Sequence, residues 1–118
     1  MTETGNFGYL GYNFQVKLLN LIISDKSFAQ SILDVVDAKY FDNQYFKLIV
    51  QIIKEYYEKY QSVPSFETLE QLTHLEVSSE MAKKCVIDML KEVKDSSFED
   101  HLFIKEKSIK FCKQQELK

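Results

Sequence analysis

The histidines and cysteines are the first candidates for chemistry in this sequence, because together they could ligate zinc. The chain has two of each: His74, His101, Cys85 and Cys112. Zinc sites contain closely spaced ligand pairs such as Cys-x-x-Cys, and no such pair occurs here. The sequence therefore predicts no metal site. Both cysteines occupy apolar positions of helical patterns, so we expect buried free thiols, which suits a reducing compartment.

The acidic residues are the next candidates, and they are densest at the glutamates of positions 55, 58, 67 and 70. Glu55 precedes Lys59 by four residues, a spacing typical of ion pairs on a solvated helix face. The chain contains no Gly-x-x-x-x-Gly-Lys-Ser/Thr loop, no nucleophile elbow and no serine beside an obvious base. We therefore expect neither catalysis nor a bound cofactor from these residues.

Nucleic-acid binding is disfavoured by charge. The formal net charge is -3 and the chain contains no arginine, the residue that grips phosphates and guanine edges bidentately. Tyr56, Tyr57 and Tyr60 have glutamates and lysines as neighbours rather than a basic groove, so we predict core packing for Tyr56 and Tyr60. Five lysines between His101 and Lys118 form a local basic stretch, which we interpret as an exposed helix face. An acidic partner or weak contact with nucleic acid is the alternative.

The amino terminus lacks the pattern of a secretory signal, and all apolar runs are too short to cross a membrane. We therefore expect a cytoplasmic protein. All three glycines lie in the first twelve residues, interleaved with aromatic residues. We predict that residues 1–12 form a flexible arm, with docking onto a neighbouring subunit as the alternative.

The rest of the chain has no glycine and a single proline, Pro64, which indicates helices throughout. The strongest pattern spans Asp42 to Tyr60, where apolar residues recur at steps of three, four and seven. Asp42 is the expected cap of this central helix. A narrow polar stripe opposite the apolar face predicts neighbours on most sides. The expected fold is all-α, a compact bundle of about six helices with a protruding C-terminal helix.

Capping signals mark the other helices. Asn13 is expected to cap a first helix that ends near Ser24, and Ser27 with Gln30 a short second one. The outer face of the first helix is predicted to carry Asn13, Lys17, Asn20 and Ser24. Pro64 and Ser65 open a fourth helix, lined by Leu69, Leu72 and Leu75. Ser78 should cap a fifth helix to about Asp95, and a capping box of Ser96 and Glu99 should start the sixth.

The sixth helix has apolar residues on more than one face. Leu102 and Ile109 are seven residues apart, as are Ile104 and Phe111, and Phe103 lies between the two stripes. We predict that some of Leu102, Phe103, Ile109 and Phe111 contact another chain. The final residues carry no stop signal, so we expect a cut in the natural chain and a missing partner helix.

The order of these signals resembles a known family. FQVKLLNLIISDKSF is followed by a short helix, then by YFDNQYFKLIVQII, a Val-Pro-Ser break and FETLEQL, and a long terminal helix beginning Glu-Asp-His at Glu99. From about Phe14 to Lys118, this resembles the N-terminal domain of DnaB-type replicative DNA helicases, especially the shorter versions of large bacteriophages.

The resemblance implies the collar domain of a hexameric helicase. Residues 13–96 would be its helical head, and residues 97–118 the truncated start of a helical hairpin that pairs subunits into dimers. Family members use the collar for ring assembly and to receive primase and the helicase loader. A motor domain that uses ATP and Mg²⁺ would lie downstream, and DNA would be bound mainly by the parent ring. The alternatives are a free-standing all-α interaction adaptor and a small nucleic-acid-binding protein.

Overall fold

The computed structural model describes residues 6–97 and 99–116, which contain six α-helices, two 3-10 helices and no strand. The expected all-α bundle of about six helices is thus confirmed. The elements are η1 (Phe7–Leu10), α1 (Tyr12–Ser24), α2 (Lys26–Ile32), η2 (Ala38–Tyr40), α3 (Gln44–Tyr60), α4 (Phe66–Glu76), α5 (Glu80–Asp95) and α6 (His101–Glu116).

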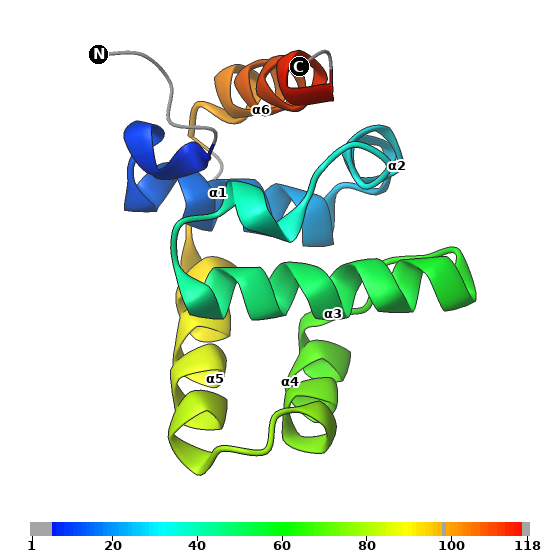
Figure 1. Ribbon diagram of the computed structural model, residues 1–118, viewed down its shortest axis with the longest axis vertical. Helices are drawn as coiled ribbons and strands as arrows, with labels where there is room; N and C mark the ends of the chain where they lie inside the picture. The colour runs from blue at the N-terminus through cyan, green and yellow to red at the C-terminus, as the bar shows by residue number, and fades with distance from the viewer. Residues whose placement is uncertain (1–5, 98, 117–118) are drawn as a thin grey trace.

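Helix α3 lies at the centre of the molecule, as its wide apolar face predicts (Figure 1). It buries Phe46, Ile49, Val50, Ile52 and Ile53. On one side lie α1 and α2, and on the other the antiparallel pair α4 and α5 runs away from it. A helix contacted from both sides can expose only its narrow polar stripe, which explains the position of α3 in the bundle.

Helix α6 packs along α1 and α2 on the side away from α3 (Figure 1). Its inner face buries Ile104, Ser108, Phe111 and Cys112. The expectation that this helix protrudes is therefore wrong: its stripe of Ile104 and Phe111 completes the core of the same globule. The prediction that it starts a helical hairpin is untested by this arrangement.

The N-terminal segment also differs from the expected arm, of which residues 1–5 lie outside the described residues. Phe7 is fully buried, and its ring centroid lies 4.7 Å from that of Phe111 and 5.2 Å from that of Phe41. Gly11 adopts φ 96°, a left-handed conformation that suits glycine, and its N–H donates to the Gly8 carbonyl. This turn leads from η1 directly into α1, and Phe7 anchors the segment.

Local capping agrees with the sequence at some helix ends and differs at others. Ser65 caps α4 as predicted, accepting from the Thr68 N–H. Helix α3 is capped by Asn43 rather than Asp42, and α5 by Ser79 rather than Ser78. Three further helix starts differ from the prediction. Gly11 rather than Asn13 precedes α1, and Asp25 rather than Ser27 caps α2. Helix α6 begins at His101, and Ser96 is the C-cap of α5 rather than the N-cap of α6.

Asn20 corrects the predicted outer face of α1. Its side chain is buried, and Nδ2 donates to the Val93 carbonyl oxygen at 2.7 Å. Because α5 packs on this side of α1, the polar position becomes a buried link between the two helices.

Candidate interaction surface

The structure separates the four residues that the sequence predicts at an interface. Leu102 and Phe103 are 65% and 57% exposed, whereas Ile109 is half-buried against the core. Phe111 is 1% exposed and contacts the rings of Phe7 and Tyr40. Phe111 is thus a core residue rather than an available contact residue, and the exposed candidates are the neighbours Leu102 and Phe103.

The outer face of α6 brings Leu102 and Ile109 onto nearly one line, because residues seven apart drift by only about 20° around a helix. A shallow hollow of about 600 Å³ lies around Ile109. Its other lining residues are Lys105, Glu106, Lys110, Lys113 and Gln114. Apolar atoms edged by lysines, with one glutamate among them, suit a partner that is both apolar and acidic.

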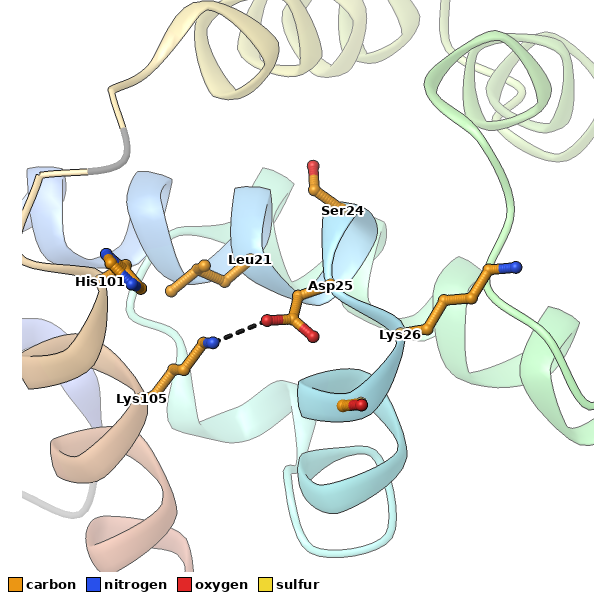
Figure 2. A pocket seen from close by; sticks show the side chains of 7 residues that line it. Leu21, Ser24, Asp25, Lys26, His101 and Lys105 are labelled. Carbon is orange, nitrogen blue, oxygen red and sulfur yellow. Dashed lines mark ion pairs between the residues drawn. The ribbon is translucent and has the colours of Figure 1, made fainter.

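Beside this face, a second hollow of about 560 Å³ lies where α1, α2 and α6 meet. Figure 2 shows Asp25 and Lys105 facing each other there, with His101 alongside and Lys26 pointing away. The Lys105 Nζ lies 2.6 Å from the Asp25 Oδ2. This ion pair joins the start of α6 to the joint between α1 and α2, and so adds to the packing of the buried face of α6.

Asp25 is held at both carboxylate oxygens. Besides Lys105, its Oδ1 accepts from the Phe28 N–H at 3.0 Å and so caps α2. The hydrogen bond from Lys105, followed by that from the Phe28 backbone, lowers the pKa of the Asp25 carboxyl. A carboxylate held in its charged form by these contacts is a structural group, and it has no neighbouring nucleophile to activate among the contacts that the structure gives it.

The candidates for metal and thiol chemistry are dispersed. Cys112 is fully buried, and this burial raises the pKa of its thiol to about 12, so little reactive thiolate forms. Cys85 is half-buried, near Tyr45, whose pKa is raised chiefly by a hydrogen bond with Cys85. Within the described part of the chain, no three His, Cys, Asp or Glu residues gather as a metal site.

The tyrosines of α3 depart from the predicted core packing. Tyr60 is 55% exposed, and its ring centroid lies 4.6 Å from that of the half-buried Tyr56. The Lys59 Nζ lies 5.3 Å from the centroid of the Tyr60 ring. The two rings pack on each other at the end of α3 rather than in the core.

A second exposed apolar site was missed by the sequence analysis. Leu75 and Met81 are 81% and 76% exposed, the highest values among the large hydrophobic residues that the structure describes. They flank the turn between α4 and α5, the end of the molecule opposite α6 (Figure 1). The signal was present, because steps of three from Leu69 rotate progressively around a helix and carry Leu75 away from the buried side.

No protein-family model, curated protein or solved structure matches the chain. In residues 6–97 and 99–116, every helix is too short or too polar to cross a membrane.

Proposed function

We propose that this chain is a non-catalytic interaction module, the N-terminal collar domain of a DnaB-type replicative helicase. It acts in ring assembly and receives primase and the helicase loader. The ATP- and Mg²⁺-dependent motor belongs to the parent protein, and DNA is bound mainly by the ring. The resemblance of the helix order supports the family, and the exposed outer face of α6 supports the mode of action.

The observation that carries the proposal is the pair Leu102 and Phe103. Both lie more than half exposed at the start of a helix whose other face is buried in the core. Covering a large apolar side chain contributes about 1.5–3 kcal/mol. Two adjacent side chains of this kind, beside a lysine-edged hollow, are typical of a contact between protein chains.

The test is a double substitution, Leu102→Ser with Phe103→Ser. We expect the wild-type chain to self-associate with rising concentration in light scattering, and the variant to remain monomeric. Tyr60→Ser is the matched control, since Tyr60 is also about half exposed but lies at the end of α3. An α6 variant that self-associates like the wild type would contradict the role of this face.

Two further measurements separate the helicase proposal from the alternatives. The reading frame beyond Lys118 should encode a phosphate-binding motor domain, and the primase of the same genome should co-sediment with the parent protein. If neither is found, the free-standing adaptor is favoured. Salt-sensitive binding of single-stranded DNA by this chain would instead favour the small nucleic-acid-binding protein.

A further inference from the structure

The N-terminal segment of residues 6–11, here called the clasp, packs on the second half of α6. Phe7 is fully buried, with its ring centroid 4.7 Å from that of Phe111, and the Tyr9 ring centroid lies 6.2 Å from the same ring. Tyr9 is nevertheless 40% exposed, so Phe7 is the principal anchor of the clasp. One inserted ring thus joins the beginning of the described chain to a helix near its end.

Helix α6 is attached to the bundle at two separate places. Its first half, residues 101–108, is held by the buried Ile104 and by the ion pair of Lys105. Its second half, residues 109–116, buries Phe111 and Cys112, and the Phe111 ring packs on the clasp and on Tyr40. The second half therefore depends on an aromatic cluster that the clasp completes, while the first half has anchors of its own.

The clasp is joined to α1 through Gly11, whose backbone suits a hinge. Gly11 has φ 96° and ψ 167°, a conformation that is essentially confined to glycine. It is exposed, and a Cβ at this position would meet no other atom within 4 Å, so its surroundings leave it room to rotate. The Gly11 N–H donates to the Gly8 carbonyl, and the Gly8 N–H to the Asn6 Oδ1. Both hydrogen bonds lie within the clasp and can be kept when it moves as a unit.

The packed second half of α6 also contains an unsatisfied polar atom. The Nε2 of Gln115, in the last turn of the helix, is buried and has no hydrogen-bond partner among residues 6–97 and 99–116. Gln115 follows Phe111 by four residues and therefore lies on the same face of the helix. A buried donor without a partner costs free energy, which is recovered when water reaches it. The packing of this half of α6 is thus opposed by one of its own side chains.

We propose that the clasp is a conformational switch: withdrawal of Phe7 releases the second half of α6, while the first half and the other helices stay folded. The burial of one phenylalanine ring favours the closed state, and the Gln115 donor opposes it, so release occurs within the folded protein. On the proposed function, this half of α6 leads toward the motor domain of the parent protein, and the clasp sets whether that connection is rigid or mobile. That consequence rests on the proposed function, whereas the switch itself does not.

Cys112 reports the release, because it is buried in the second half of α6 and its thiol reacts only when solvent reaches it. The folded chain is treated with iodoacetamide, whose methylene carbon bonds to the Cys112 sulfur as iodide leaves. Mass spectrometry of peptides measures this modification separately from that of Cys85. The labelling is repeated at several low denaturant concentrations. We expect a rate nearly independent of denaturant, since a local opening exposes little surface, whereas global unfolding accelerates steeply.

Two substitutions should move the labelling rate of Cys112 in opposite directions. Gly11→Ala disfavours the hinge conformation of the closed clasp, and we expect labelling about tenfold faster. Gln115→Met removes the unsatisfied donor and keeps an unbranched side chain, and we expect labelling about tenfold slower. Leu75→Ala, exposed near the turn between α4 and α5, is the control and should leave the rate unchanged. Simple fraying of α6 would not respond to Gly11→Ala, because Gly11 lies outside this helix.

A labelling rate that rises with denaturant as steeply as global unfolding would overturn the inference, because Cys112 would then be reached only in the unfolded chain. A rate that Gly11→Ala or Gln115→Met leaves unchanged overturns it as well. Circular dichroism shows whether each variant is folded, and the denaturant series on the wild type decides the question without them. Either negative result leaves the proposed function standing, and a reading frame without a motor domain leaves the switch standing.

Discussion

The two ends of the molecule are built in opposite ways. At the α6 end, the rings of Phe7, Phe14, Tyr40, Phe41 and Phe111 pack on one another and are nearly inaccessible to solvent. At the α4–α5 end, Leu69, Val86 and Leu90 are buried near α3, while Leu75 and Met81 beside the turn are exposed. The aromatic residues therefore contribute most to the free energy of unfolding, and substitutions at the turn between α4 and α5 should alter it little.

The largest expected effect comes from Phe111→Ala. Phe111 contacts Phe7, Tyr40 and Tyr9, so its loss leaves a cavity between α6 and the N-terminal segment. We expect the free energy of unfolding to fall by about 3–5 kcal/mol, as is typical for a buried phenylalanine. Leu75→Ala beside the turn between α4 and α5 should change it by no more than about 0.5 kcal/mol. Denaturant unfolding of both variants measures the contrast, and equal losses would show that the two ends do not differ in this way.

The helices of this fold could be predicted where hydrophobic periodicity and a breaker agree. For α3 and for the start of α4, both signals lie within the segment itself. The seventeen residues of α3 carry the repeating apolar pattern, and the break at Pro64 follows them. The capping residue is harder to predict from sequence. Asp42 and Asn43 are both favourable N-cap residues, and which of them caps α3 depends on the residue at which the helical backbone begins. Asn43 accepts from the N–H groups of Tyr45 and Phe46, and so takes that role.

Burial that depends on distant residues could not be predicted from local patterns. Glycines around Phe7 indicated a flexible arm, but Phe7 fills a space made by Phe41 and Phe111, which are 34 and 104 residues away in the chain. In the same way, the two stripes of α6 were visible in the sequence, but which of them faces α1 depends on tertiary packing. Ile104 and Phe111 face inward, and Leu102 faces outward.

A moderate effect is expected at the link between the two regions. Asn20 Nδ2 donates to the Val93 carbonyl at the end of α5, so Asn20→Asp replaces a donor by an acceptor beside a buried oxygen. We expect a loss of about 1–3 kcal/mol in the free energy of unfolding. Val93 keeps its bonds from the Ser96 N–H and Oγ, so the cost arises at the buried carboxylate of the variant, which has lost its partner and repels the carbonyl oxygen. Asn13→Asp, exposed on the same helix, is the control, and a loss there of the same size would argue against this link.

The smallest expected effect concerns the ion pair at the start of α6. The pKa of Asp25 is lowered in the folded state from its usual value of 3.8, so the folded protein favours the charged carboxylate. The stabilisation is therefore present above about pH 4 and is lost as the pH falls through the lowered pKa of the folded state. Because both side chains are partly exposed, we expect no more than about 1 kcal/mol.

Asp25→Asn removes the charge and keeps an oxygen that can cap α2, and Lys105→Met removes the partner. At neutral pH each substitution should lower the free energy of unfolding, and the double variant should lose less than the sum of the two. The difference between the wild type and Asp25→Asn should shrink in acid and in high salt, because protonation removes the charge and ions screen the pair. A difference that stays constant from neutral to acid pH would mean that the charge of Asp25 does not stabilise the fold, and that α6 is held in place by its buried side chains alone.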